Sequence, residues 1–119
     1  MRYIDGFLVP VPKAKKEAYK ALAEIAGPIW IEHGAIDYVE AWGDDIPVGK
    51  TNDFRTAVIA EQDEEVVFSW IIWPSKEARD AGNAKVMADP RLKMEGQDMP
   101  FSGARMIYGG FASLVEHKG

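Results

Sequence analysis

The residue types that could carry out chemistry are few in this chain. It has no cysteine and two histidines, of which His33 lies in a predicted helix and His117 in the polar tail. A histidine at a helix end can act as a general base or bind a metal, and it can equally complement the negative end of the helix dipole. A zinc site needs two or more histidine or cysteine ligands, and Glu32 points to a different helix face from His33. We therefore expect no metal site.

Asp5 is the second candidate because it lies between Tyr3 and Phe7 in a largely apolar segment, where a buried charge requires a partner or a task. Arg105 begins the strand that we expect beside it, so the two side chains can meet. Asp5 is then either an acid–base group in a cleft, its pKa raised by desolvation or lowered by Arg105, or half of a structural pair. A water-exposed Asp5 near the sheet edge is the third interpretation.

Aromatic residues form the third group of candidates. They are numerous and include Tyr38, Trp30, Trp42, Trp70 and Trp73. Such side chains can line an apolar pocket with a few polar groups, and they can also form ordinary core or a dimer interface.

We predict five ligand-binding residues, taken from these three groups, and no cofactor: Asp5, His33, Tyr38, Trp70 and Arg105.

Two glycine motifs resemble cofactor sites and fail on inspection. The segment Gly43–Thr51 ends in GKT, but it has five residues between its glycines where a phosphate-binding loop has four, and its two aspartates would repel phosphate. The pair Gly109-Gly110 lies inside a predicted strand, where a bulge or a close backbone approach explains it better than a cofactor does.

Composition excludes further classes of function. Fourteen basic and nineteen acidic residues give a net charge of −5, which opposes binding to nucleic acid. The absence of cysteine excludes disulfides and thiolate sites, and no segment approaches the ~20 apolar residues of a membrane span. We expect a cytoplasmic protein without nucleic-acid or membrane partners.

Hydrophobic patterning predicts four strands and two helices in the order β-α-β-β-α-β. Their ranges are strand 3–11, helix 12–33, strand 35–42, strand 66–73, helix 75–88 and strand 105–114. Ser75 is a predicted N-cap, and Ala78, Ala81 and Met87 are expected to face inward. Gly27-Pro28 predicts a kinked or restarted first helix. Residues 54–60 fit either a strand or a helical turn, and residues 94–103 read as an irregular loop.

This order is that of a ferredoxin-like α+β sandwich, with a four-stranded antiparallel sheet whose first and third strands are central. Asp37 and Glu40 fall on opposite faces of the second strand, so at least one should face solvent. Two helices cover only one face of such a sheet, yet the strand 66–73 is apolar on both. We therefore predict one domain over residues 1–119 that forms a homodimer through facing sheets.

Several segments also resemble a known family. YIDGFLVPVP, EHGAIDYVEAWGDDIPVGK, VVFSWIIWPSKEARDAGNAKVMADPR and MPFSGARMIYGGF resemble the YbaA-like family of small bacterial proteins of unassigned function, in the dimeric α+β barrel superfamily. The resemblance implies a dimeric barrel and leaves function open, because that superfamily includes monooxygenases, isomerases and binding domains. Its monooxygenases can use an Asn, Trp and His set, and this chain has Asn83, Trp70 and His33 without any sign that they converge.

The function that we expect is binding of a small, largely apolar metabolite in the barrel pocket, with or without its transformation and without a tightly held cofactor. The alternative is a non-enzymatic, dimeric interaction or stress-related module whose interior is filled by its own side chains. An enclosed, partly polar cavity distinguishes the two.

Overall fold

The computed structural model describes residues 1–93 and 98–119. It contains four strands and three helices: β1 (Tyr3–Pro12), α1 (Lys16–Glu32), β2 (Asp37–Trp42), α2 (Phe54–Ala57), β3 (Glu64–Trp73), α3 (Lys76–Ala88) and β4 (Ile107–Ala112). Short 3-10 turns precede α1 at Lys13–Lys15 and follow α3 at Pro90–Leu92. Of the irregular loop expected over 94–103, residues 94–97 lie outside the described residues. The segment 54–60, open between two interpretations, begins with the single helical turn of α2.

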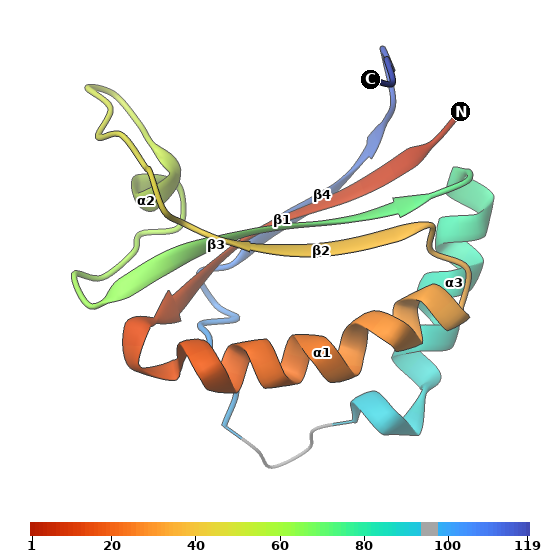
Figure 1. Cartoon of the computed structure of the whole chain (residues 1–119), viewed down its shortest axis with the longest axis horizontal. Helices are drawn as coiled ribbons and strands as arrows, with labels where there is room; N and C mark the ends of the chain where they lie inside the picture. Colours follow the sequence, from red (N-terminus) through yellow and green to blue (C-terminus); the bar gives the residue numbers. More distant parts are fainter. Residues whose placement is uncertain (94–97) are drawn as a thin grey trace.

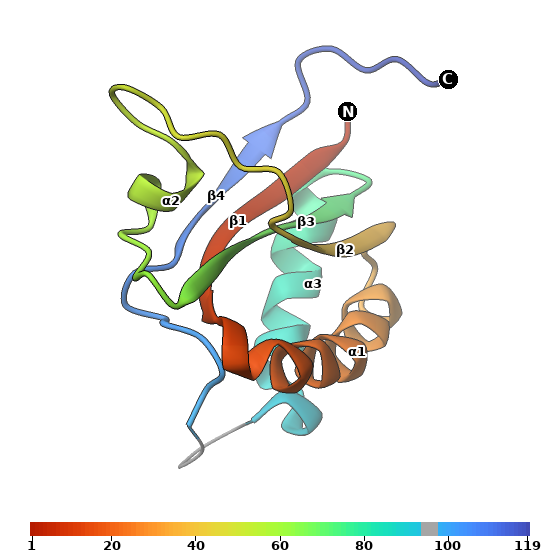
Figure 2. The ribbon, with the colours of Figure 1, turned by 60° about the vertical axis from the view of Figure 1, so that its left-hand side comes forward.

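The four strands form one sheet in the order β2-β3-β1-β4, and every neighbouring pair is antiparallel. The ferredoxin-like α+β arrangement with β1 and β3 in the centre is therefore confirmed. Both α1 and α3 lie on the same side of the sheet (Figures 1 and 2). Among the described residues, no helix combines the length and apolar character that crossing a bilayer requires.

The helix ends follow the signals in the sequence. The Ser75 side chain accepts a hydrogen bond from the Ala78 amide at 3.1 Å and caps α3. The Asp89 side chain accepts one from the Arg91 amide at 2.9 Å and caps the following turn. Gly34, which follows the C-cap residue His33 of α1, has a φ of 111°, which a residue with a side chain rarely adopts.

The first helix does not restart at Gly27-Pro28, because α1 is one helix from Lys16 to Glu32. Pro28 is exposed, so the carbonyl that loses its helical partner there can be hydrated. Gly27 is buried against β2, and a Cβ at this position would lie 3.0 Å from Cδ1 of Tyr38. Gly27 therefore lets the Tyr38 ring pack directly against the helix backbone.

The inward face of α3 differs from the prediction. Gly82 and Val86 are its buried residues, whereas Ala81 and Met87 are exposed. The cause is the fully buried indole of Trp73, which occupies the space where a side chain on Gly82 would stand. The helix packs on the indole through its glycine, and this turns Ala81 and Met87 toward solvent.

We call the opposite side of the sheet the open sheet face (Figure 2). In the described part of the chain the only helix that reaches it is the single turn of α2, whose Phe54 packs edge-on against Phe68 at 6.1 Å. By the strand register it consists of Ile4, Gly6, Leu8, Pro10, Pro12, Asp37, Val39, Ala41, Glu64, Val66, Phe68, Trp70, Ile72, Ile107, Gly109 and Phe111. Phe68, Ile107 and Phe111 are 45%, 46% and 60% exposed. The expectation that the helices leave one apolar face uncovered is confirmed.

Candidate functional site

A carboxylate between two phenols is the central feature of the helix-covered side of the sheet. Tyr19 donates a hydrogen bond from its hydroxyl to Oε1 of Glu40 at 2.7 Å, and Tyr38 donates to Oε2 at 2.6 Å. Tyr38 and Glu40 are two residues apart on β2, so both side chains leave the strand on the same face. Tyr19 reaches them from α1, in the apolar stripe of that helix. Each oxygen of the carboxylate is thus held by a phenol from a different direction.

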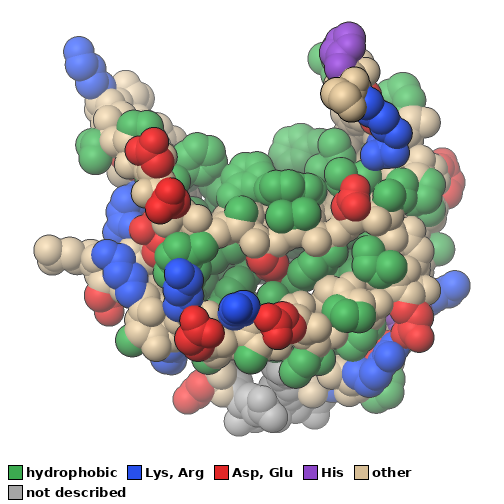
Figure 3. Space-filling model, viewed as in Figure 1, with side chains coloured by type: hydrophobic (Ala, Val, Ile, Leu, Met, Phe, Trp, Pro, Cys, Tyr) green, Lys and Arg blue, Asp and Glu red, His purple; other side chains and the backbone are tan. Residues whose placement is uncertain are grey.

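Tyr19, Tyr38 and Glu40, which we call the trio, lie between two spaces. An inner cavity of about 340 Å³ lies between the sheet and the helical layer, and an outer groove of about 790 Å³ runs between α1 and β2. Tyr19, Tyr38 and Glu40 belong to the walls of both. Apolar side chains are visible in the recess between β2 and α1 in Figure 3.

Most of the inner cavity is apolar. Its wall includes Phe7, Trp30, Ile71, Phe101 and Met106 from the strands, α1 and the segment before β4. Outside the trio, its polar side-chain groups are the hydroxyl of Ser69 on β3 and the indole N–H of Trp30 on α1, as far as the described residues show. The cavity therefore combines a hydrophobic interior with one carboxylate.

The electrostatics of the trio keep both phenols protonated. Burial raises the pKa of Tyr19 and of Tyr38 far above the ordinary value of 10, and the negative charge of Glu40 raises both further. In the described part of the chain, no lysine, arginine or histidine nitrogen lies within 4.0 Å of the Glu40 carboxylate. The phenols are therefore the groups that solvate it.

The predicted contact between Asp5 and Arg105 is wrong. In the register of β1 with β4, Asp5 lies opposite Gly110, whereas Arg105 precedes the first residue of β4. Arg105 instead pairs with the buried Glu64 at the start of β3, at 2.6 and 2.7 Å, and donates to the Ile59 carbonyl. The neighbouring strand was predicted correctly, but the register places the two residues at different ends of it.

Asp5 has partners on β3 and α3. Its carboxylate accepts hydrogen bonds from Nε1 of Trp73 at 2.9 Å and from Nη2 of Arg79 at 2.9 Å. The guanidinium also lies over the ring of Tyr3, 4.9 Å from its centroid. Gly110 of β4 leaves the room for this arrangement, because a side chain there would collide with Tyr3 and Arg79. The close-approach interpretation of this glycine is confirmed, and Asp5 is part of a structural ion pair.

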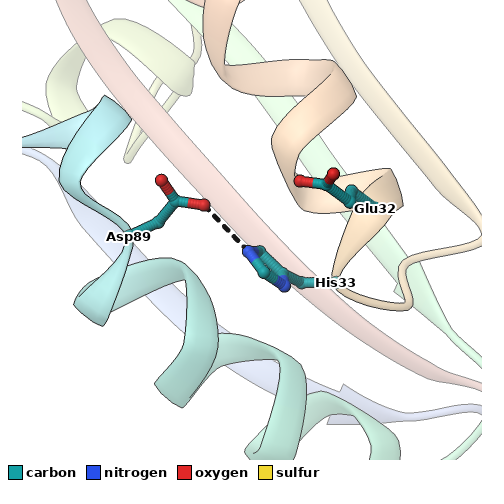
Figure 4. Close-up of side chains that lie close together, drawn as sticks. All are labelled: Glu32, His33 and Asp89. Carbon is teal, nitrogen blue, oxygen red and sulfur yellow. Dashed lines mark hydrogen bonds and ion pairs between the residues drawn. The ribbon is translucent and has the colours of Figure 1, made fainter.

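His33 belongs to an ion-pair network at the ends of α1 and α3. Its Nε2 lies 2.9 Å from Oδ2 of Asp89, and Glu32 lies close by (Figure 4). The possible metal-ligating atoms of these three residues are within 4.8 Å of one another, so the prediction that Glu32 points away from His33 is wrong. The helix ends at Glu32, and both side chains turn toward the end of α3.

Arg91 supplies the positive charge of this network. It contacts both Asp89 and Glu32, with a distance of 2.6 Å from Nη2 to Oδ2 of Asp89. Arg91 and His33 hold the pKa of the Asp89 carboxyl well below its ordinary value. The cluster thus joins two helix ends and is already balanced by a guanidinium.

The five predicted residues do not form one site. Tyr38 lines both spaces, whereas Asp5, His33 and Arg105 lie in three separate ion-pair networks. Trp70 is on the open sheet face, where it packs edge-on against Phe68 at 5.3 Å. His33 and Asn83 belong to the helical layer on the other side of the sheet, so the Asn, Trp and His set does not converge.

Sequence reasoning did not select Tyr19 and Glu40. The spacing of Tyr38 and Glu40 placed both on one strand face, and Tyr19 lay in the apolar stripe of the first helix. These signals were present, but the sequence did not show that the helix stripe and this face of β2 meet. Asp37 is the residue of the Asp37/Glu40 pair that faces solvent, as one of the two was expected to do.

Replacing Asp5 by alanine tests the structural assignment of that residue. We expect Asp5→Ala to lower the free energy of unfolding by about 3 kcal/mol, because it leaves the Arg79 guanidinium and the Trp73 indole without their acceptor. Asp80→Ala is the matched control: Asp80 also contacts Arg79, at 2.9 Å, but is exposed, and should cost less than about 1 kcal/mol. Urea unfolding measures both. An Asp5→Ala protein as stable as the wild type would contradict the assignment.

Comparisons with known proteins give the family of the chain. The model of the family described as "Protein of unknown function (DUF1428)" matches residues 2–103. The uncharacterised protein YbaA of Escherichia coli K12 is 58% identical over 116 residues, which cover 98% of this chain and 99% of that protein. YbaA of Shigella flexneri has the same identity and coverage.

Similarity to a solved structure also supports the fold, at lower identity. Rv0793 from Mycobacterium tuberculosis superposes with a TM-score of 0.55 at 16% identity, over 99% of this chain and 100% of that one. A putative antibiotic biosynthesis monooxygenase from Bacillus cereus gives 0.46 at 16% identity, over 98% of each chain. The resemblance to the YbaA-like proteins is therefore confirmed, and the chain belongs to the DUF1428 family.

Proposed function

We propose that the protein binds a small, largely apolar molecule in the inner cavity, with Glu40 as the polar group that orients it. The observation that carries the proposal is the carboxylate held by Tyr19 and Tyr38 in the wall of an otherwise apolar space. Ligand sites in proteins are typically clefts of this kind, lined by hydrophobic and aromatic side chains with a few fixed polar groups.

The volume of the cavity favours a ligand-binding function over a module whose interior is filled by its own side chains. About 340 Å³ is within the range of ~300–1,000 Å³ that small-molecule sites occupy. The space opens to solvent beside the exposed side chains of Met87 and Met99, so a ligand can enter it. The alternative of a module filled by its own side chains is therefore the weaker one.

Proton transfer is the chemistry that this site supports best. Glu40 has a free lone pair on each oxygen beside those that accept the phenol hydrogen bonds. A carboxylate so placed can accept a proton from a bound molecule, and the phenols fix its orientation while it does so. In this step the proton passes from the bound molecule to Glu40, and both the acceptor and the orienting phenols belong to this chain.

We also propose that a second copy of the chain covers the open sheet face. This face is apolar over all four strands, and its exposed side chains include Phe68, Ile107 and Phe111. Hydrophobic side chains gather above β2 in Figure 3, between the projecting segment that follows β2 and the C-terminal tail. A contiguous apolar surface of this kind is typical of an interface, and two-fold symmetry lets the same face meet itself.

Filling the inner cavity tests the binding proposal. The probe is 2-naphthylmethanol, a neutral aromatic alcohol, and its binding is followed by isothermal titration calorimetry. We expect Ala26→Phe to abolish binding, because Ala26 of α1 lines the inner cavity and the larger side chain enters it. Ala21→Phe, at an exposed position of the same helix, should bind like the wild type.

Thermal unfolding of both variants shows whether they fold. If Ala26→Phe folds and binds the probe with the same affinity as Ala21→Phe does, the probe lies outside the inner cavity and the proposal is wrong. A wild-type protein that binds no probe at all would also count against it.

A charge on the open sheet face tests the dimer. We expect the wild type to sediment as a dimer at micromolar concentration and Phe111→Glu to sediment as a monomer, because a buried, unpaired carboxylate opposes association. Ala112→Glu, exposed on the other face of β4, should remain dimeric. A monomeric wild type, or a dimeric Phe111→Glu, would contradict the proposal; analytical ultracentrifugation measures all three.

A further inference from the structure

We infer that the ligands of the inner cavity are apolar amines, bound in their protonated form with the ammonium group on the Glu40 carboxylate. This inference rests on the proposed function, since it names the chemical class of molecule that the same site takes. It follows from the direction of the hydrogen bonds, the charge of the site and the nature of its walls.

The hydrogen-bonding groups of the cavity are mainly acceptors. The hydroxyl hydrogens of Tyr19 and Tyr38 are both used on Glu40, so these phenols offer only oxygen lone pairs to a ligand. The carboxylate oxygens likewise only accept. The donors of the described wall are the Ser69 hydroxyl and the Trp30 indole N–H, and neither carries a charge. A ligand that satisfies this site must bring hydrogen-bond donors, and an ammonium group brings three.

In the described residues, no cation lies within 4.0 Å of the Glu40 carboxylate to balance its charge. The arginines nearest the sheet have other partners: Arg79 pairs with Asp5, and Arg105 pairs with Glu64. A carboxylate in an apolar cavity attracts a positive charge more strongly than one in water does, because the surrounding dielectric is lower. The cavity is therefore matched to a monocation and opposed to an anion.

Two lysines, Lys16 and Lys20, line the outer groove, but their ammonium groups have other partners than the Glu40 carboxylate. The Lys16 ammonium lies over the Trp42 ring, 5.1 Å from its centroid, and Lys20 lies 4.0 Å from Glu24 on the exposed side of α1. Neither lines the inner cavity as the structure describes it. The contact of Lys16 with Trp42 shows that an ammonium already associates with an aromatic wall of the outer groove.

The walls of the cavity define the rest of the ligand. Aromatic rings of Phe7, Trp30 and Phe101 join those of Tyr19 and Tyr38 around the space. Such rings bind a flat apolar body, and their faces attract a nearby cation. An arylalkylamine has both parts, with a short link between the ring and the charged nitrogen.

A pair of probes that differ only in the head group tests this inference. We compare 2-naphthylmethylamine with 2-naphthylmethanol by calorimetry at about pH 7, where the amine is protonated and the alcohol is neutral. We expect the amine to bind the wild type at least about tenfold more tightly, which corresponds to about 1.4 kcal/mol.

Two variants assign the preference to Glu40. Glu40→Gln keeps the shape of the side chain and removes its charge, so it should bind both probes with similar affinity. Glu24→Gln makes the same change of charge at the outer groove, and it should retain the preference of the wild type. An amine preference that survives in Glu40→Gln would mean that the negative net charge of the protein causes it, and would overturn the inference.

The remaining outcomes separate the two proposals. Equal binding of both probes to the wild type would overturn the amine inference and leave the cavity proposal intact, whereas binding of neither would overturn both. If Glu40→Gln does not fold, carbon-13 NMR of the wild type with labelled glutamate replaces it. The amine should then shift the Glu40 carboxyl resonance more than the alcohol does, and equal shifts would contradict the inference.

Discussion

The two hydrogen bonds to Glu40 are the interactions on which the candidate site depends. A carboxylate between a helix and a sheet is costly unless polar groups solvate it. Here Tyr38 approaches along the strand and Tyr19 approaches from α1, so the same bonds that solvate the charge also join α1 to β2. Gly27 is part of this arrangement, because its missing side chain admits the Tyr38 ring to the helix surface. The hydrogen bonds of Tyr19, Tyr38 and Glu40 hold α1 and β2 together, and the inner cavity lies beside these three residues.

The two faces of the sheet have different roles. The helix-covered face carries Asp5 with Arg79 and Glu40 with its phenols, and the ends of the helices above it carry His33 with Asp89. The open sheet face is largely apolar, and its charged positions in the strand register are Asp37 on β2 and the buried Glu64 at the start of β3, which pairs with Arg105. A molecule that binds by charge therefore fits the first face, and a large apolar partner fits the second. The proposed ligand site and the proposed dimer interface do not compete for the same residues.

The sequence predicted more of the fold than of the site. Element order, strand order and helix caps follow from local signals such as Ser75 and from the apolar character of the strand 66–73 on both faces. The site depends on register, which local signals do not fix: Arg105 was expected beside Asp5, but the pairing of β1 with β4 places Gly110 there. Helix rotation is equally non-local, because the Trp73 indole decides which side of α3 faces inward. Glu40 carried a signal, its spacing from Tyr38, but its partner Tyr19 is 21 residues away in the chain.

Ionisation of the tyrosines reports whether Tyr19 and Tyr38 hold the Glu40 carboxylate. The chain has four tyrosines, and carbon-13 labelling of the ring carbon that carries the hydroxyl gives one NMR signal for each. We expect the Tyr19 and Tyr38 signals to keep the position of a protonated phenol up to about pH 11, where an ordinary phenol is largely ionised, because burial and Glu40 raise the pKa of both. If either signal moves to the phenolate position near its ordinary pKa of 10, that phenol is hydrated and does not hold the carboxylate, and the account of the site is wrong.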